Sequence, residues 1–491
     1  MTRAGRLSWS LVTAAALCAC VGPSFHRPAP PKAERFTAQK LPAATASADT
    51  PGGAAQQFLT GQDVPRNWWT LYGSADLDAL VADALRANPT VRAAQAALRQ
   101  ALENTAAQRG AYFPDAQGNF TASRQRNAVG VLSPSLSSGV ALFNLYTPQV
   151  NVTYVPDVFG ANRRAVESLA AQAEASRDQL DATYLTLTAN VVTAAVQEAG
   201  LRAQVAATEH ALVFERDALS VLRRALELGS AAEGDVYAQE AAVAQLEATL
   251  PPLQKQLDQT RNALAALTGR LPADLPPLRF ELNDLVLPTD LPLGVPSQLV
   301  QRRPDVRAAE AQLHAATAQV GVAVANFFPQ LTITGGFGST ATSTADLFRA
   351  GTGFWSIGAS LSQTLFAGGT LVHRKRAADA ALDQAGALYQ AAVLTAFQNV
   401  ADALNAIQSD ADAIGAAARA AAAADKSLAV VRKQLELGAV SYLALVSAEQ
   451  TDAQATIALA QARTNRYMDT AALFQALGGS IAPVPAVDNN R

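Results

Sequence analysis

The sequence predicts a mixed α/β membrane protein built from two internal repeats, and three observations support this fold class. Residues recur at fixed spacings: Pro89 and Pro304 are 215 positions apart, and the LELG of residues 226–229 returns 209 positions later at residues 435–438. Four short segments alternate apolar and polar residues with period two, which is typical of strands. Residues 163–228 continue for 66 positions without proline, which is longer than an ordinary globular helix. Because the whole order of elements recurs, we interpret the chain as one unit used twice.

The N-terminus has the form of a lipoprotein signal peptide over residues 1–19. Arg3 and Arg6 precede an apolar run at residues 7–17, which is shorter than the about 20 residues needed to span a bilayer. Residues 17–20, LCAC, have the form of a lipobox, so we expect cleavage before Cys20 and a diacylglycerol and N-acyl lipid on that cysteine. The alternative is plain secretion with an incidental cysteine. The only two cysteines lie in this segment, which excludes a disulfide framework in the body.

Residues 20–67 are predicted to form an acylated linker or strap over the folded body. They are rich in Pro, Ala, Gly and Thr and lack sustained periodicity, so they should bury little. Trp68, Trp69 and Tyr72 then begin the ordered part. Because no ligand motif accompanies these aromatic residues, we expect them to anchor the core.

Each repeat begins with a helix that runs into an aromatic-proline junction. Pro304 suits a first helical turn, and Asp305 is well placed for the helix dipole. The junctions should end these helices, because the residue before a proline is disfavoured in the α region. The junction residues are Phe113 and Pro114 in the first repeat and Phe328 and Pro329 in the second.

Two pairs of strands are expected, at about residues 115–157 and about 330–366. Residues 127–156 and 315–345 contain no Asp, Glu, Lys or Arg, whereas the outer face of a soluble sheet usually carries charges. This favours a lipid-facing band with a wet interior, and the alternative is a soluble half-buried sheet. The expected apolar faces are Ala116, Gly118, Phe120 and Ala122; Val150, Val152 and Tyr154; Leu331, Ile333 and Phe337; and Trp355, Ile357, Ala359 and Leu361.

Four strands cannot close a membrane barrel by themselves. Membrane barrels need about eight strands or more, and unpaired strand edges cannot face lipid. The membrane interpretation therefore requires an oligomer. Residues 133–135 and 343–346 would then lie in the loops between strands.

Long helical hairpins are expected at about residues 162–269 and about 370–477. In the first hairpin the returning helix should break or kink at Pro251 and Pro252. Such lengths indicate coiled-coil packing, and the many alanines would permit close lateral contact between helices.

Several motifs give the chain a resemblance to a known family. They are VGPSFHRP after Cys20, WWTLYGSADLDAL at residues 68–80, NALAALTGRLP at residues 262–272, PSQLVQRRPDV at residues 296–306 and NFFPQLTITGGFG at residues 326–338. The sequence closely resembles the NodT-type outer-membrane lipoproteins of RND efflux systems, relatives of OprM and TolC. The resemblance implies a homotrimer whose protomers each give four strands to one 12-stranded transmembrane β-barrel, continued by a long periplasmic α-helical barrel. It places the repeats at residues 68–287 and 288–480, with a C-terminal tail at residues 481–491.

The resemblance also implies the partners and the location. We expect a passive exit duct in the outer membrane of a Gram-negative bacterium, in contact with outer-membrane lipid and extending into the periplasm. It would receive small molecules from an inner-membrane RND transporter through a periplasmic adaptor protein. The alternatives are a TolC-like protein-secretion duct and a structural, lipid-anchored periplasmic coiled coil.

The hairpin tips are the expected contacts for the adaptor and the closed end of the channel. Glycine at each turn suits a helix end that needs positive φ, although a turn without a partner would explain it equally well. The adaptor role therefore rests on the resemblance. The tip residues are Leu226, Gly229, Ser230, Leu435, Gly438, Val440, Ser441 and Tyr442.

The charge at the aperture departs from that of the relatives, which commonly carry acidic residues shortly after the second glycine. This chain has Ala444 and Ser447 there, and the nearest acids are Asp235 and Glu449. We expect these two carboxylates to matter less to closure than contacts of Leu435, Val440 and Tyr442.

No constellation for catalysis, metal or cofactor binding is visible. The four histidines, His26, His210, His314 and His373, lack metal-ligand spacing, and no P-loop exists. Arg302 and Arg303 could resemble a phosphate site, but we interpret them as a structural pair near the end of a short helix. A net charge of −3 gives no electrostatic case for nucleic acid.

Overall fold

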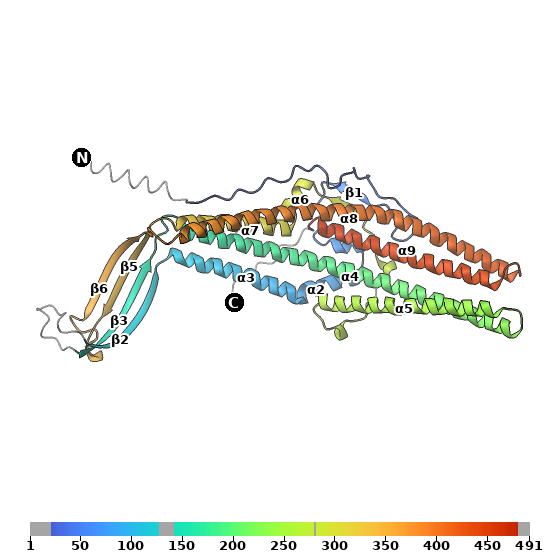
Figure 1. The fold of residues 1–491 in the computed structure, drawn as a ribbon, viewed down its shortest axis with the longest axis horizontal. Helices are drawn as coiled ribbons and strands as arrows, with labels where there is room; N and C mark the ends of the chain where they lie inside the picture. Colours follow the sequence, from blue (N-terminus) through green and yellow to red (C-terminus); the bar gives the residue numbers. More distant parts are fainter. Residues whose placement is uncertain (1–20, 127–141, 279–280, 480–491) are drawn as a thin grey trace. The chain divides into compact units, whose positions relative to one another are not determined.

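The fold contains long helices and one larger sheet in the part of the chain that is described, residues 21–126, 142–278 and 281–479 of a computed structural model (Figure 1). The described residues divide into two compact units: residues 21–27, 97–126, 142–176 and 309–389 form one, and residues 28–96, 177–278, 281–308 and 390–479 form the other. The strands are β1 (Gln57–Thr60), β2 (Asp115–Arg126), β3 (Leu142–Tyr154), β4 (Asp290–Leu293), β5 (Gln330–Ser339) and β6 (Gly353–Ser362). The α-helices are α2 (Ala75–Ala87), α3 (Pro89–Arg109), α4 (Ala161–Glu227), α5 (Glu233–Leu267), α6 (Pro296–Arg302), α7 (Pro304–Ala325), α8 (Thr370–Glu436) and α9 (Tyr442–Ala476). Short 3₁₀ turns complete the described elements.

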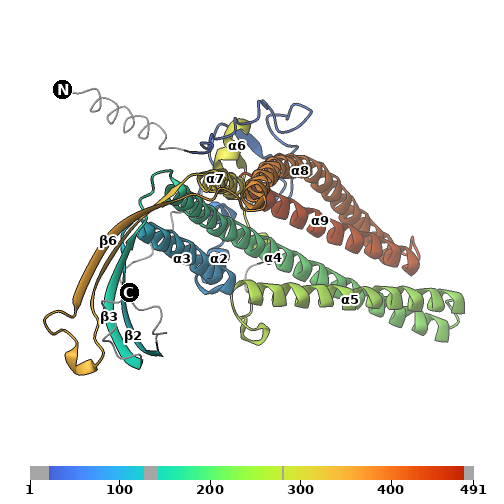
Figure 2. The same cartoon turned by 60° about the vertical axis from the view of Figure 1, so that its left-hand side comes forward.

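The first unit contains a four-stranded antiparallel sheet in the order β2-β3-β5-β6, drawn as one curved sheet in Figure 2. Directly opposed residues of antiparallel strands lie on the same face. Val150 faces Gly118 on one side and Phe337 on the other, and Phe337 faces Trp355. The apolar faces predicted separately for the four strands therefore form a single face of one sheet.

That apolar face is exposed in the single chain. Phe337, Trp355 and Ile357 are 69%, 76% and 75% exposed, which a soluble sheet would avoid. Strand β5 begins at Gln330, directly after Pro329, because proline has no N–H to donate to a neighbouring strand. Its partner Ser362 ends β6, so β6 stops four residues before the predicted limit of 366.

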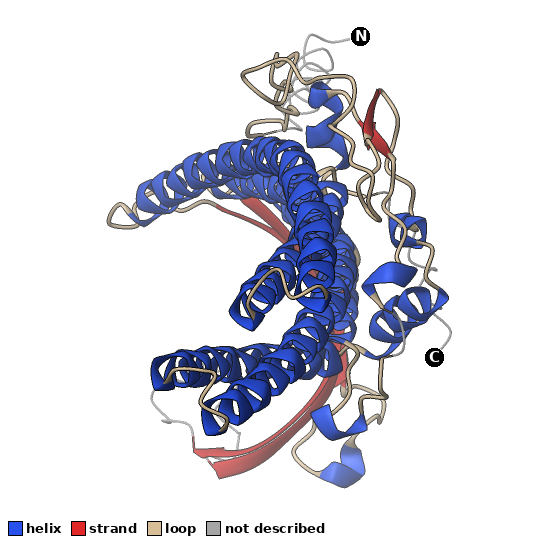
Figure 3. Cartoon of the chain, turned by 90° about the vertical axis from the view of Figure 1, so that its right-hand side faces the viewer, coloured by secondary structure: helices blue, strands red, loops and turns tan. Residues whose placement is uncertain are grey.

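The second unit contains most of two helical hairpins, α4 with α5 and α8 with α9, whose helices lie side by side in Figures 1 and 3. Helices α4 and α8 each have 67 residues, and α5 and α9 each have 35. The prediction was a break or a kink at Pro251 and Pro252, and the break is wrong, because α5 continues through both prolines. Both prolines are exposed, so the carbonyl groups that they leave without a helical donor can bond water instead.

Aromatic residues form the core of the second unit where the predicted ordered part begins. Trp68 and Tyr72 are 1% and 0% exposed, which confirms their predicted role, whereas Trp69 is only partly buried. The Trp68 ring centroid lies 5.3 Å from that of Phe474 in α9. The Tyr72 hydroxyl donates to the Tyr467 carbonyl at 2.8 Å, which joins this core to α9.

One face of α9 holds the strap, and this was not predicted. Arg466 is fully buried and donates to Gln56 Oε1 at 3.3 Å, to Thr45 Oγ1 at 3.1 Å and to the Ala54 carbonyl at 2.7 Å. The expectation that the strap buries little is therefore wrong for this stretch, where Gln56 is also fully buried. Hydrogen bonds to a buried guanidinium hold the strap in place, so the apolar content of the strap does not predict how much of it is buried.

Described helices provide no membrane span: each is either too short or too polar to cross a bilayer.

Candidate functional site

Each hairpin turns on a glycine with positive φ. Gly229 has φ 74° and Gly438 has φ 71°. At the first tip the Gly229 N–H donates to the Leu226 carbonyl at 2.9 Å and the Ser230 N–H donates to the Ala225 carbonyl at 2.8 Å. The second tip repeats these bonds from Gly438 to Leu435 and from Ala439 to Gln434. Both are Schellman ends, in which glycine supplies the left-handed residue.

The tips expose apolar side chains. Leu228 and Leu437, each one residue before its turn glycine, are 78% and 75% exposed. Ser230 and Ser441 are exposed, while Leu226, Leu435 and Val440 are half-buried. These two exposed leucines occupy corresponding positions at the two tips.

Tyr442 joins the second hairpin to the first. Together with Leu226 and Leu246, it packs against a buried cluster of α4 and α5, which consists of Leu212, Leu219, Leu222, Val236 and Val243. Burial raises the pKa of the Tyr442 phenol, and the carboxylates of Glu449, Asp217 and Glu215 raise it further. The phenol therefore stays neutral, and its ring provides an apolar contact between the hairpins.

The two acids predicted at the aperture lie in different surroundings. Asp235 is exposed in the first turn of α5, where a carboxylate stabilises the positive end of the helix. Glu449 is partly buried and pairs with Arg432 of α8 at 3.3 Å. The charge of Glu449 is therefore balanced by a neighbouring helix rather than presented alone.

Arg432 also contacts the first hairpin, a role that the sequence did not reveal. Its guanidinium carbon lies 5.8 Å from the centroid of the Phe214 ring in α4, and Phe214 in turn meets His210 edge to face. These residues line a groove of about 220 Å³ together with Glu215, Glu449 and Asp452. No spacing along the sequence reveals this contact, because Phe214 and Arg432 are far apart in the chain.

The predicted junction residues lie where helices give way to strands. Phe113 follows α3 with an extended backbone at φ −111° and ψ 157°, and β2 begins at Asp115 after Pro114. Phe328 follows α7 and stacks on Phe159, with ring centroids 5.0 Å apart. Pro329 then leads into β5.

Arg302 and Arg303 make structural contacts. Arg302 pairs with Asp63, while Arg303 is buried, pairs with Asp305 at 2.7 Å and donates to the Ala476 carbonyl at 2.9 Å. Among the residues that the structure describes, no group of three or more His, Cys, Asp or Glu side chains could hold a metal. Cys20 lies outside the described residues.

A sheet with an exposed apolar face, together with two long helical hairpins, is typical of an outer-membrane duct rather than of an enzyme. Residues 80–270 and 295–479 match the outer membrane efflux protein family, and the chain belongs to that family. It is therefore an outer-membrane efflux channel and not an enzyme.

Characterised relatives agree with this assignment. The chain is 29% identical to the outer membrane protein OprJ of Pseudomonas aeruginosa over 96% of this chain and 95% of OprJ. It is also 29% identical to the pyoverdine export outer membrane protein OpmQ of Pseudomonas putida, over 88% of this chain and 90% of OpmQ.

Solved structures are similar in fold. The outer-membrane channel OprN matches with a TM-score of 0.80 and 28% identity, over 94% of this chain and 99% of OprN. The open state of the Neisseria gonorrhoeae MtrE outer membrane channel matches with a TM-score of 0.79 and 27% identity, over 94% of this chain and 98% of MtrE.

Proposed function

We propose that this channel is the exit duct of a tripartite RND-type efflux system, and that three copies form one 12-stranded barrel continued by a tunnel of helices. The observation that carries the proposal is the single exposed apolar face shared by β2, β3, β5 and β6. Relatives named as outer membrane proteins of toluene and antibiotic efflux pumps support export of small molecules. The duct would need no cofactor.

The edges of the sheet support an oligomer. β2 and β6 are its two outermost strands, so each has one side that pairs with no other strand of the described chain. Within lipid such an edge must pair, and pairing β6 of one copy with β2 of the next satisfies both. Three copies provide twelve strands, enough to close a barrel.

The proposed repeat has matching contacts in both halves. Asn88 donates from its side chain to the Leu267 carbonyl at 2.8 Å, and Arg303, 215 positions later, donates to the Ala476 carbonyl at 2.9 Å. Each residue thus holds the end of the returning helix of its own half. These matches support repeats at residues 68–287 and 288–480, each with one strand pair and one hairpin.

We place the periplasmic end at the hairpin tips. Exposed Leu228 and Leu437 would contact the adaptor, and the contacts of Tyr442 and Arg432 with the first hairpin would hold the closed state. Opening would then require the second hairpin to leave the first. Energy for opening would come from partner binding, since a passive duct has no source of its own.

The N-terminus would be fixed to the outer membrane by lipid on Cys20. The LCAC sequence at residues 17–20 supports this modification. A lipid on Cys20 would act together with the barrel in anchoring the protein, since a single acyl chain alone binds a membrane only weakly.

The test is the native mass of the protein extracted from outer membranes in mild detergent. We expect three copies, each carrying acyl mass on Cys20. A monomer that leaves the membrane without detergent once its lipid is removed would contradict the shared barrel.

A further inference from the structure

The four strands of the larger sheet carry charged side chains at three described positions, Asp115, Arg124 and Arg126, all of them in β2. Asp115 is the first residue of β2, and Arg126 is the last. Arg124 and Arg126 lie an even number of residues from Phe120, so both belong to the exposed apolar face. Asp115 lies an odd number of residues away and belongs to the other face. The apolar face is therefore charged at one end, and the charge there is positive.

The two arginines lie at the end of β2 that is far from the helices. β2 begins after the junction with α3, and β3 runs back to the loop before α4. Arg126 is opposite Leu142, the first residue of β3, and Arg124 is opposite Asn144. Tyr146 lies two residues further along β3 on the same face. Tyrosine is enriched where lipid meets water, so this end of the sheet has the composition of a membrane boundary.

Neither arginine has an acidic partner in the part of the chain that the structure describes. Both side chains are exposed, and neither takes part in a described ion pair. The sequence of residues 127–141, which follows β2, contains no Asp or Glu. Asp346, in the turn between β5 and β6, already pairs with Arg349 at 2.6 Å and accepts a hydrogen bond from Ser343 at 2.8 Å. The two positive charges of β2 therefore have no described counter-charge.

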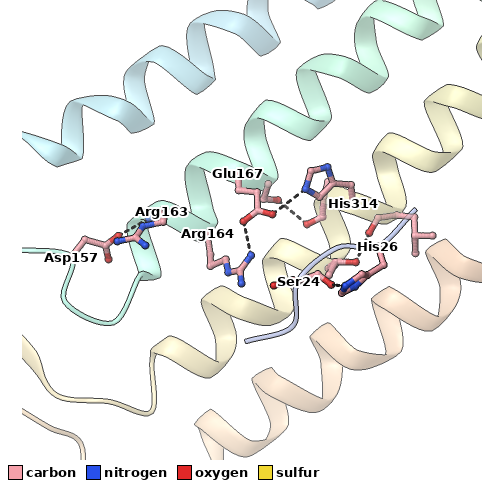
Figure 4. A network of polar contacts seen from close by, with 11 residues as sticks. Ser24, His26, Asp157, Arg163, Arg164, Glu167 and His314 are labelled. Atoms are coloured by element: carbon pink, nitrogen blue, oxygen red, sulfur yellow. Dashed lines mark hydrogen bonds and ion pairs between the residues drawn. The ribbon is translucent and has the colours of Figure 1, made fainter. Parts of the chain in front are cut away.

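Arginines at the opposite end of the sheet do contact acidic residues, as Figure 4 shows for the start of α4. Arg164 donates to Glu167 Oε2 at 2.7 Å. The backbone N–H of Arg163 donates to Asp157 Oδ2 at 2.7 Å. Within this compact unit, charges are neutralised where the strands meet the helices. The arginines of β2 differ from them in facing outward without such a partner.

The spacing along β2 places the two arginines at the outer boundary of a membrane. Arg124 and Arg126 are eight and ten positions after Ala116, about 27 Å and about 34 Å along an extended strand. A tilt of about 40° turns these lengths into about 21 Å and about 26 Å of height, and the apolar band of a membrane barrel is about 25 Å tall. The proposed function puts the helices in the periplasm, so this boundary is the external one.

From this placement we propose that Arg124 and Arg126 bind the phosphate groups of a phosphorylated glycolipid in the outer leaflet of the membrane. Guanidinium groups form bidentate hydrogen bonds with phosphate, and a charge on the lipid face costs least near the interface. The two residues are about 7 Å apart along one strand, so they can hold phosphate from two directions. The acyl chains of the lipid would lie along the apolar face below. This inference rests on the proposed barrel.

A second copy of the chain is the rival partner. In the proposed trimer β6 of one copy adjoins β2 of the next, so the turn that carries Asp346 would approach the outer end of β2. The existing partners of Asp346 favour the lipid instead, because its charge is already balanced by Arg349. A phosphorylated lipid, by contrast, carries a negative charge at the height where the arginines lie.

Native mass spectrometry of the full-length channel in mild detergent tests the inference, because it counts both the copies of the chain and the lipids bound. The probe is lipid A with both phosphates, and the same lipid without phosphates is the lipid control. We expect Arg124→Gln with Arg126→Gln to weaken binding of the phosphorylated lipid at least tenfold. Arg124→Lys with Arg126→Lys keeps the charge and should weaken it less. The matched control is Asp346→Asn with Arg349→Gln, which removes a mutually neutralised pair at the same end of the sheet and should leave the affinity unchanged.

The outcomes separate the lipid site from the rival and from the barrel. Equal binding of the phosphorylated lipid by the wild type and the glutamine variant, or equal binding of both lipids by the wild type, would overturn the lipid site. Loss of trimers without lipid, in both the glutamine variant and the Asp346→Asn, Arg349→Gln variant, would assign the arginines to the neighbouring copy. A monomeric wild type would overturn the barrel and this inference with it, whereas a trimer that binds both lipids alike would overturn this inference alone.

Discussion

Arg432 and Glu449 form an ion pair across the second hairpin at 3.3 Å, where Arg223 and Glu240, each 209 positions earlier, form one across the first at 2.7 Å. The pair that the sequence suggested as an aperture charge is thus the counterpart of a link within a hairpin. Within the part of the chain that the structure describes, the second pair alone has a cation–aromatic contact with the other hairpin, since Arg432 also lies over Phe214 of the first hairpin.

Replacing Arg432 should loosen the closed tips more than replacing Glu449. Arg432→Gln removes the ion pair and the contact with Phe214, which is worth about 0.5–1 kcal/mol, whereas Glu449→Gln removes only a pair worth about 0.5 kcal/mol. Conductance of the purified channel in planar bilayers measures the effect. Arg223→Gln is the control, because the described ion pair of Arg223 is with Glu240 of its own hairpin. Equal leak from Arg223→Gln and Arg432→Gln would refute the role of Phe214.

Tyr442→Ala should raise leak conductance several-fold, while Asp235→Ala should change it little. Tyr442 packs on the cluster of the first hairpin, and loss of a half-buried ring costs about 1–2 kcal/mol. Asp235 is exposed and stabilises only its own helix end. A large leak from Asp235→Ala with none from Tyr442→Ala would sink the hypothesis that tip contacts dominate closure.

Asp410→Asn should stabilise the protein at pH 8 and give little advantage at pH 4. Burial raises the pKa of Asp410 to about 7, helped by a hydrogen bond and the charge of Asp469, with Arg466 opposing. An unfolded aspartate titrates near about 3.9, so between these values the folded state binds more protons. Stability of the wild type should therefore fall as pH rises from about 4 to about 7 and then level off.

Thermal unfolding of the detergent-solubilised protein at several pH values measures this effect. Asp412→Asn changes an exposed aspartate of the same helix and serves as the matched control. A midpoint for Asp410→Asn that stays parallel to that of the wild type across pH 4–8 would mean that Asp410 does not titrate in this range.

Asn88→Ala should destabilise the protein by about 1–2 kcal/mol. Its side chain caps two helices: Oδ1 accepts from the Thr90 N–H at 2.7 Å at the start of α3, and Nδ2 donates to the Leu267 carbonyl at the end of α5. Equilibrium unfolding in denaturant gives the change. Asn88→Asp retains the first cap and loses the second, so it should lie between the two. If Asn88→Ala and the wild type unfold alike, the caps contribute nothing.

The order of elements could be predicted because it depends on local signals. Pro304, the Pro329 junction and the turn glycines Gly229 and Gly438 mark boundaries that the structure reproduces within a few residues. Period two assigned each strand its apolar face, and the pairing of Val150 with Phe337 unites these faces. Signals of this kind act within a single helix, strand or turn, so they can be recognised from one sequence without knowing which elements pack together.

The contacts that link distant elements could not be predicted. Arg466 with the strap, Arg432 with Phe214 and Phe25 with His314 each join residues more than 200 positions apart. Arginine and histidine occur on many exposed helix faces, so their residue types carry no signal of burial. Pro251 and Pro252 are a local signal that predicted a helix break, yet the surrounding helical turns keep α5 continuous.

The corresponding helices of the two hairpins have equal lengths, and this limits where the chain can accept insertions and deletions. The spacing between corresponding residues falls from 215 before the strands to 209 after them, so the six extra residues of the first half lie in its strand hairpin and connections. The helical hairpins have the same lengths in both halves, with 67 residues in the first helix and 35 in the second. Insertions and deletions should therefore be tolerated between β5 and β6, where an epitope tag could be placed, and rejected in any single helix.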